Sequence, residues 1–286
     1  MAASEEEILL VDADTINLEI ELLIQAIFSK FQYDFRHYSR SSLRRRLEQA
    51  MVKYDVESIS DIQKKILHEK DFFPKLLAYM TVNTTELFRD ADYFLSVKKN
   101  VFPFLKTFPS IKIWIAGCST GEEVISLSIL LKESGFTKYL IYATDINPMN
   151  LEVARRGIYS IDTIKKAHRN YQLSGGEGSL SNYYDTAYDS IRFNEGLLEN
   201  VVFSDHSLST DAVFSEIHFI SCRNVLIYFD RPLQERVFKL FQESLVRDCY
   251  LGLGSKETIQ FSDVRGSFET VDQENRIYRK KESYAG

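Results

Sequence analysis

The stretch that most constrains the fold is residues 111–123, which read Ile-Lys-Ile-Trp-Ile-Ala-Gly-Cys-Ser-Thr-Gly-Glu-Glu. The apolar residues up to Ala116 predict a short strand, the segment from Gly117 to Gly121 predicts a tight turn, and the apolar-rich residues 124–131 predict a helix. A strand, a glycine turn and a helix form the first half of a nucleotide-binding βαβ unit. This stretch therefore predicts an α/β domain with a ligand site at the glycine turn.

The next apolar run supplies the second strand of that unit. Residues 139–143 are mostly apolar and lead into Thr144 and Asp145, which lies 24 residues beyond Gly121. An acidic residue at the end of the second strand lies where the ribose hydroxyls of a nucleotide are bound. Asp145 is therefore a candidate ribose ligand.

The glycine loop departs from the dinucleotide pattern. It has the spacing Gly-x-x-x-Gly instead of Gly-x-Gly-x-x-Gly, and Glu122 and Glu123 open the helix. Two carboxylates suit the N-terminal end of a helix dipole, but they would repel a pyrophosphate. A cofactor with an adenosine and no phosphate fits better, and S-adenosylmethionine, which is cationic at sulfur, is the common one. An ordinary turn of an α/β domain remains the alternative.

Composition sets the broad class. The chain has 286 residues with 44% hydrophobic and 27% charged residues, which suits one large or two modest globular domains. A net charge of −6 argues against nucleic acid as a partner. The three cysteines show neither a disulfide framework nor zinc spacing, so we expect no metal and a reducing cytoplasm. No apolar run reaches the ~20 residues of a membrane span, so direct membrane insertion is not expected.

Residues 1–80 are expected to form a helical N-terminal domain. Apolar residues at positions 43, 47, 50, 51 and 54 fall on one face of a single helix. Arginines on or beside that helix form a basic face, which could dock an acidic partner. They are Arg40, Arg44, Arg45 and Arg46. A merely solvated helix face is the equally open alternative.

The remainder is expected to be a linker with a connecting helix over residues 81–110, followed by the α/β domain over residues 111–286. The alternation of strands and helices stops from about residue 170 to 205. The sequence there predicts short strands that form a small antiparallel β insertion, which includes residues 201–203. Residues 157–159 are expected to close the helix over 148–156. Later strands over 217–221, 250–254 and 276–280 would complete the sheet.

Four segments together resemble the CheR family, the chemotaxis receptor glutamate O-methyltransferases. The segments are Asn83-x-Thr85-x-x-x-Arg89, Gly117–Glu123, Ala143–Ile146 and Cys222-Arg-Asn-Val-x-Ile-Tyr-Phe229. The resemblance covers roughly residues 30–280. It implies a class I S-adenosylmethionine-dependent methyltransferase sheet, Rossmann-like, with a small antiparallel β insertion and a preceding all-α domain.

The resemblance also implies an activity. Members transfer a methyl group from S-adenosylmethionine to glutamate side chains in the helical cytoplasmic region of membrane chemoreceptors, which leaves S-adenosylhomocysteine. A glutamate with a pKa near ~4.3 is already ionised at neutral pH, so the reaction needs no general base. A bacterial, cytoplasmic protein, monomeric and recruited to membrane receptors, is expected.

Site residues follow from the resemblance, residue by residue. Those expected at the cofactor are Asn83, Thr85, Arg89, Gly117, Glu123, Asp145, Ser207, Leu208, Cys222 and Arg223. Arg89, Arg223 and Tyr228 are expected to border the methyl group and to position the incoming carboxylate. From residue type alone, Arg223 could instead pair with a carboxylate at the end of the sheet, and Tyr228 could belong to the core. Cys222 is expected to be a packed small residue and not a nucleophile.

The chain departs from the family pattern at two places that bear on function. Ser207-Leu208 stands where many members have Asn-Leu, which could lower cofactor affinity, and Gln49-Ala50 stands where a second basic pair often occurs. The Ser207 departure alone supports the alternative function, a non-catalytic S-adenosylmethionine-binding docking module of a signalling array. A methyltransferase for small molecules or nucleic acid, and a nicotinamide-dependent oxidoreductase, fit the sequence less well.

Overall fold

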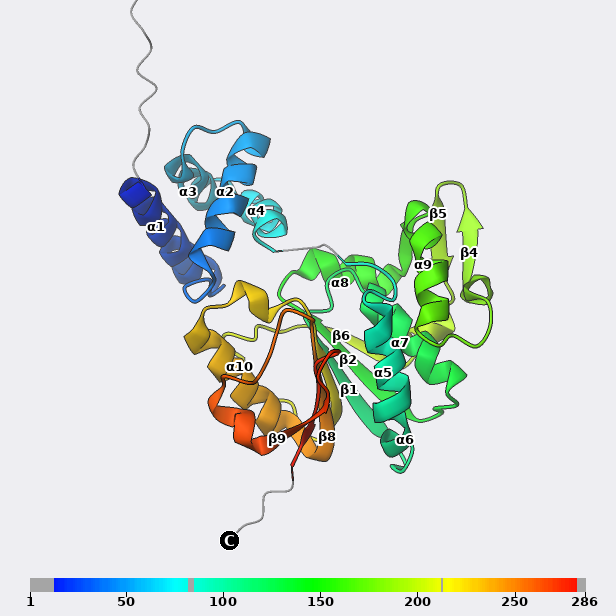
Figure 1. The fold of residues 1–286 in the computed structure, drawn as a ribbon. Coiled ribbons are helices and arrows are strands. Elements are labelled where there is room, and N and C mark those ends of the chain that lie inside the picture. Colours follow the sequence, from blue (N-terminus) through cyan, green and yellow to red (C-terminus); the bar gives the residue numbers. More distant parts are fainter. Residues whose placement is uncertain (1–12, 82–84, 212, 282–286) are drawn as a thin grey trace, which may run out of the picture. The chain divides into compact units, whose positions relative to one another are not determined.

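The computed structural model describes residues 13–81, 85–211 and 213–281. The chain divides into two compact units, Met1–Thr81 and Val82–Gly286. Each unit has its own fold, as Figure 1 shows.

Over residues 13–81, the first unit has four helices: α1 (Ala13–Phe31), α2 (Arg40–Tyr54), α3 (Ile59–His68) and α4 (Phe72–Met80). The apolar face predicted for α2 is confirmed, because Leu43, Leu47 and Ala50 are buried. The start of α3 is fixed by a capping box, in which Ser58 and Asp61 satisfy each other's backbone N–H groups. The predicted all-α character of this region is confirmed.

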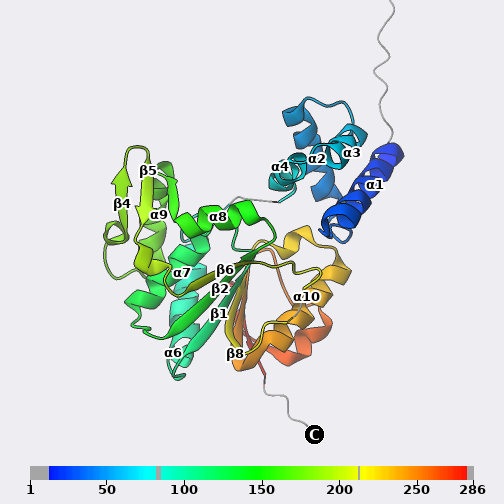
Figure 2. The ribbon, with the colours of Figure 1, turned by 180° about the vertical axis from the view of Figure 1, so that it is seen from behind.

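The second unit is built on a seven-stranded sheet with the order β6-β2-β1-β7-β8-β10-β9. The strands are β1 (Ile111–Ala116), β2 (Tyr139–Asp145), β6 (Val201–Asp205), β7 (Ile217–Cys222), β8 (Leu245–Leu253), β9 (Phe268–Asp272) and β10 (Ile277–Lys280). The first five strands in this order are parallel, and the last two pair antiparallel. All five parallel strands therefore end at one edge, which carries the glycine turn after β1 (Figure 2).

Helices cover both faces of this sheet. They are α5 (Ala91–Ser96), a π-helical turn (Val97–Val101), α6 (Phe102–Leu105), α7 (Glu122–Glu133), α8 (Pro148–Arg156), α9 (Asp162–Leu173) and α10 (Arg231–Ser244). In Figure 1, α5 and α7 lie on one face and α10 on the other. Ile113 and Ile115 of β1 join the core beneath α7, whereas Trp114 points the other way and contacts Phe241 of α10. Burial on both faces explains why β1 is apolar without interruption from Ile113 to Ala116.

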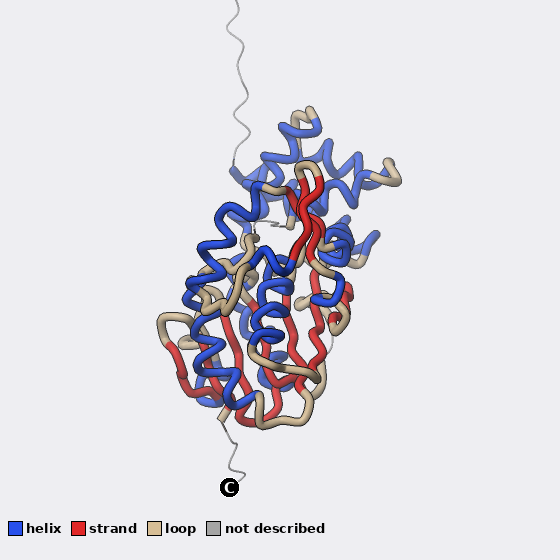
Figure 3. The backbone as a smooth tube through the Cα atoms, turned by 90° about the vertical axis from the view of Figure 1, so that its right-hand side faces the viewer, coloured by secondary structure: helices blue, strands red, loops and turns tan. Residues whose placement is uncertain are grey.

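A second, three-stranded antiparallel sheet has the order β3-β5-β4, with β3 (Ile158–Ser160), β4 (Tyr184–Ala187) and β5 (Ser190–Phe193). Figure 3 shows the β4–β5 hairpin projecting from the unit. The predicted β insertion is therefore present.

Three details of the sequence prediction are wrong. Residues 201–203 do not join the insertion, because β6 pairs parallel with β2 at the edge of the large sheet, with Val201 opposite Ile141. Residues 158–160 do not merely close α8 but form β3, which pairs with β5. Strand β9 was not predicted, since its sequence alternates with only Phe268 buried. For β6 and β3 the partner strand is distant in sequence, and a short apolar run does not specify its partner.

Candidate active site

The glycine turn is held against the end of β2. The backbone N–H groups of Gly117 and Cys118 both donate to the carbonyl oxygen of Thr144, each at 2.8 Å. Gly121 has a φ of +94°, and a Cβ there would lie 2.7 Å from the Cβ of Ala154. Only glycine permits both this backbone conformation and the close approach of α8. The glycine spacing therefore reflects packing of the turn against its neighbours.

Asp145 is the last residue of β2 and lies beside this turn. Its side chain accepts hydrogen bonds from the backbone N–H groups of Ser119 and Asn147, both at 2.9 Å, and from Nδ2 of Asn150 at 3.2 Å. The residue is 8% exposed, and burial raises the pKa of its carboxyl group. A carboxylate has about four acceptor positions, so roughly one remains for a ligand hydroxyl.

Further carboxylates surround the start of α7. Glu122 is buried and accepts a hydrogen bond from the Thr120 hydroxyl at 2.7 Å, and burial raises the pKa of its carboxyl group. The Glu123 carboxylate accepts from the Ser221 hydroxyl at 2.5 Å and from Nη1 of Arg223 at 3.0 Å. The turn is thus acidic, which suits a cationic ligand and disfavours a pyrophosphate.

Arg223 follows β7 and is almost completely enclosed. Its side chain is 2% exposed. Its guanidinium pairs with the Glu123 carboxylate at 3.0 Å and with the Asp90 carboxylate at 2.7 Å. Nη2 also donates to the carbonyl oxygen of Arg89 at 2.8 Å, and the ring of Tyr93 lies 4.1 Å from the guanidinium carbon. Burial lowers the pKa of Arg223, but Glu123, Tyr93 and Asp90 outweigh it, so the net shift is upward and the group stays charged.

These contacts match the alternative considered from sequence, in which Arg223 pairs with carboxylates at the end of the sheet. Such a guanidinium fixes the segment around Arg89 against α7. Direct contact between Arg223 and an incoming carboxylate stays a prediction.

The segment before α5 carries three of the predicted residues. Asn83 lies outside the described residues, and Thr85 and Arg89 are half-buried. Arg89 is flanked by Phe88 and Asp90, whose φ angles are +53° and +57°. The N–H of Phe88 donates to the Ser126 hydroxyl at 2.8 Å. The backbone at Arg89 is therefore held by α7 on one side and by Arg223 on the other.

The loop after β7 is organised by a residue that sequence reasoning missed. Glu257 is 4% exposed, and its Oε1 accepts from the N–H groups of Val225 at 2.9 Å, Leu226 at 2.7 Å and Ile227 at 3.4 Å. Its Oε2 accepts from the N–H groups of Asn224 at 3.0 Å and Gly254 at 2.7 Å. Burial raises the pKa of Glu257, and these bonds act in the opposite direction.

One carboxylate thus shapes the whole Cys-Arg-Asn loop. The available signal was an acidic residue three positions after Gly254, in the loop that follows the neighbouring strand β8.

The remaining predicted residues lie around this edge. Tyr228 ends a short 3₁₀ helix (Leu226–Tyr228) and is half-buried. Leu208 is buried, and the Ser207 hydroxyl bonds to the Ser209 hydroxyl at 2.7 Å. Cys222 is fully buried, and burial raises its pKa well above the ordinary value, so its thiol is not a ready nucleophile.

Two buried polar atoms at this edge have no hydrogen-bond partner within the described part of the chain: Oγ of Ser119, in the glycine turn, and Nε of Arg223. Buried polar groups are nearly always satisfied, so such atoms point to a missing ligand or water. Together with the spare acceptor position of Asp145 and the acidic turn, they fit a cationic nucleoside such as S-adenosylmethionine.

Comparison with protein families agrees with this geometry. Residues 83–277 match the model described as CheR methyltransferase, SAM binding domain, and residues 18–81 match CheR methyltransferase, all-alpha domain. The chain belongs to the CheR methyltransferase family. Its second unit is therefore an S-adenosylmethionine-binding methyltransferase domain, as the sequence motifs predicted.

Relatives in the CheR family carry corresponding names. The chain is 49% identical over 265 residues to a Pseudomonas putida protein named "Putative methyltransferase Cher3", covering 92% of this chain and 97% of that protein. It is 28% identical to a "Chemotaxis protein methyltransferase" of Listeria monocytogenes, covering 79% and 84%. A protein of the same name from Borreliella burgdorferi is 29% identical, covering 85% and 88%.

The basic set on α2 of this CheR family member is partly neutralised within the first unit. Arg40 pairs with Glu21 at 3.3 Å, and Arg44 pairs with Glu48 at 2.9 Å. Nη1 of Arg46 donates to the carbonyl oxygen of Tyr79 at 3.2 Å. Arg45 is exposed and has no acidic partner among the described residues. Arg45 therefore offers the least compensated charge of the four.

Within residues 13–81, 85–211 and 213–281, no helix has the length and apolar character needed to cross a membrane. Over the same residues, no group of three or more His, Cys, Asp or Glu side chains could hold a metal ion.

Proposed function

We propose that this protein transfers a methyl group from S-adenosylmethionine to glutamate side chains of membrane chemoreceptors, which forms glutamate methyl esters and leaves S-adenosylhomocysteine. The observation that carries the proposal is the arrangement of the parallel-strand edge. An acidic glycine turn with Asp145 adjoins the loop that bears Arg223 and Tyr228, in a chain of the CheR family. The relatives named chemotaxis protein methyltransferase support the choice of substrate.

The donor side of the site is assigned to the ends of β1 and β2. Asp145 would bind the ribose through its remaining acceptor position, and Glu123 would lie near the methionyl part. Gly117 and Cys222 would admit the ligand closely, with Leu208 and Ser207 lining the adenosine. Asn83, Thr85 and Arg89 would close the site from the segment before α5.

The acceptor side is assigned to Arg89 and Tyr228. Because the glutamate is already anionic, these side chains need only align its oxygen with the methyl carbon and sulfur, and such alignment is a large part of catalysis. An arginine binds a carboxylate through one or both oxygens. The pairing of Arg223 with Glu123 and Asp90 supports a positioning role for it, holding the backbone of Arg89.

The proposed setting follows from the substrate. The protein would act in the bacterial cytoplasm as a monomer, recruited to the helical cytoplasmic region of receptors, without inserting into the membrane. The basic residues of α2, above all Arg45, would dock the acidic acceptor protein.

The test is methyl transfer from labelled S-adenosylmethionine into membranes containing a chemoreceptor of the same bacterium. We expect incorporation that is released by mild base, as carboxyl esters are. Arg89→Ala should lower the rate at least about 100-fold, and Arg89→Lys, which keeps the charge but not the planar fork, should be intermediate.

Calorimetry with S-adenosylmethionine decides between this function and its alternative. Tight binding by the wild type without transfer to any receptor would favour a non-catalytic docking module. Absence of binding at millimolar cofactor would contradict both.

A further inference from the structure

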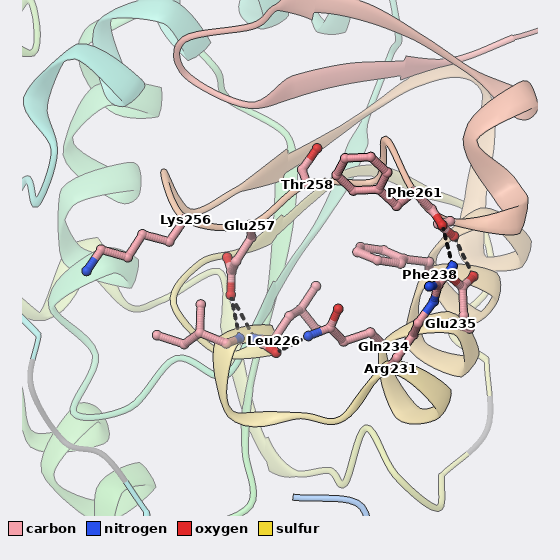
Figure 4. Close-up of a pocket in the computed structure, with 11 residues that line it drawn as sticks. Leu226, Arg231, Gln234, Glu235, Phe238, Lys256, Glu257, Thr258 and Phe261 are labelled. Atoms are coloured by element: carbon pink, nitrogen blue, oxygen red, sulfur yellow. Dashed lines mark hydrogen bonds between the residues drawn. The ribbon is translucent and has the colours of Figure 1, made fainter. Parts of the chain in front are cut away.

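A pocket of about 330 Å³ lies beside the proposed acceptor loop. Its walls come from the loop after β7, from α10 and from the loop after β8, as Figure 4 shows. β7 and β8 are neighbouring parallel strands, with Ser221 opposite Gly252. Both loops therefore leave the same edge of the sheet that carries the glycine turn, and ligands of open α/β sheets bind at this edge.

The pocket is apolar within and at part of its rim. Leu226 and Phe238 are buried in its wall, whereas Ile227 and Phe261 are exposed, Phe261 by 79%. An exposed phenylalanine beside a hollow is typical of a protein-binding surface, because aromatic side chains supply much of the binding energy at interfaces.

The charges around the pocket are unevenly compensated. Glu257 accepts five backbone N–H bonds, and Glu235 accepts from the Ser262 hydroxyl at 2.7 Å and the Asp263 N–H at 3.0 Å. Arg231 and Lys256 are exposed, and neither has an acidic partner among the residues that the structure describes. The single bond of Arg231 in the pocket runs to the carbonyl oxygen of Phe261 at 3.4 Å. The pocket therefore presents two available cations beside apolar side chains.

We propose that this pocket binds the acceptor protein next to the methylated glutamate, with an apolar side chain in the hollow and acidic side chains against Arg231 and Lys256. This inference rests on the proposed function and specifies its substrate as an amphipathic acidic segment. Leu226 and Ile227 line the pocket, and Tyr228 completes the same 3₁₀ turn. A segment bound in the pocket would therefore contact Ile227, the residue next to Tyr228, whose side chain is proposed to hold the acceptor glutamate.

The first test compares two double variants of the full chain. Arg231→Ala with Lys256→Ala should raise KM for a purified receptor cytoplasmic fragment about three- to tenfold and reduce its dependence on salt, since rim charges act mainly on association. kcat and the affinity for S-adenosylmethionine should stay within twofold. The control, Arg236→Ala with Lys239→Ala, removes two exposed charges of α10 outside the pocket and should leave KM unchanged.

The second test locates the bound segment directly. Phe261→p-benzoylphenylalanine should photocrosslink to the receptor fragment at or beside a methylated glutamate, as mapped by mass spectrometry.

Two results would overturn the inference. If the wild type methylates the fragment but the pocket variants match the control and no crosslink forms, the pocket is not a substrate site while the proposed function stands. If the wild type neither binds nor methylates the fragment, the proposed function fails, and the inference fails with it.

Discussion

Glu257 shows how much one buried carboxylate can determine. Its two oxygens accept five backbone N–H groups from residues 224–227 and Gly254, and both oxygens are engaged. No hydroxyl or amide side chain could replace it, because each of them has a single acceptor oxygen where the carboxylate has two. The loop that carries Arg223 and Tyr228 therefore depends on a residue more than 25 positions away.

Glu257→Gln is the sharpest test of this role. The amide nitrogen would face N–H donors, and leaving buried donors unsatisfied should lower the free energy of unfolding by about 1–3 kcal/mol. Chemical denaturation measures this loss. We also expect kcat to fall at least tenfold, with a smaller change in the dissociation constant for S-adenosylmethionine, because the displaced loop carries Tyr228, which is proposed to hold the acceptor glutamate.

Glu235→Gln is the matched control. Only one oxygen of Glu235 is engaged, so the amide can turn its oxygen to Ser262 and Asp263. Its stability should change by less than about 0.5 kcal/mol. Equal losses in the two variants, or an unchanged kcat in Glu257→Gln, would contradict a positioning role for Glu257.

At the same scale, the sequence motifs located Asp145, Glu123 and Arg223 but not their contacts. Asp145 directly follows an apolar run, so its position at the end of β2 could be predicted from the sequence. The ion pairs of Arg223 were not, because Asp90 and Glu123 lie far from it in sequence and meet it only after the sheet has formed.

Among the elements, α2 carries the basic face that sequence analysis singled out. The structure distinguishes its members: Arg44 is paired with Glu48 along the helix, whereas Arg45 is exposed with no acidic partner in the described chain. An already paired charge contributes less to attracting a partner, because its field is largely cancelled by its neighbour.

Arg45→Glu should therefore raise KM for a receptor fragment about fivefold or more at low salt, with the effect shrinking as salt screens the interaction. Steady-state methyl transfer at several salt concentrations measures it. Arg44→Gln is the control and should change KM less than twofold. A similar effect from both variants would show that docking does not depend on the uncompensated charge.

Element prediction succeeded where the pattern was long and local. The helix over residues 148–156 was predicted with the bounds of α8, because a proline follows its N-cap and Gly157, with a φ of +58°, ends it. β6 was assigned to the wrong sheet because its five residues carry no information about their partner. β9, with a single buried apolar residue, gave no signal.

At the scale of the whole molecule, the chain divides into two compact units. The protein has one tryptophan, Trp114, which is fully buried in β1 of the second unit. Its fluorescence therefore follows unfolding of the methyltransferase unit alone, whereas far-UV circular dichroism follows both units.

S-adenosylmethionine should stabilise the second unit selectively. At a ligand concentration of 100 times the dissociation constant, the expected gain is about 2.7 kcal/mol in the transition reported by Trp114. Thermal unfolding measures the two responses, because Trp114 fluorescence reports the second unit and far-UV circular dichroism reports both units. Asp145→Ala should abolish the fluorescence shift. An equal shift in both transitions would show that ligand binding involves the first unit as well.

In the proposed function, the methyl donor binds at the ends of β1 and β2, and the acceptor protein binds at the ends of the neighbouring strands β7 and β8. Glu257 holds the loop after β7, so a graft of residues 254–262 from a relative has to keep this glutamate. Such a graft should redirect the enzyme toward that relative's receptors without changing its affinity for S-adenosylmethionine. Receptor preference would then depend on a few surface residues, while the methyl-transfer site stays the same.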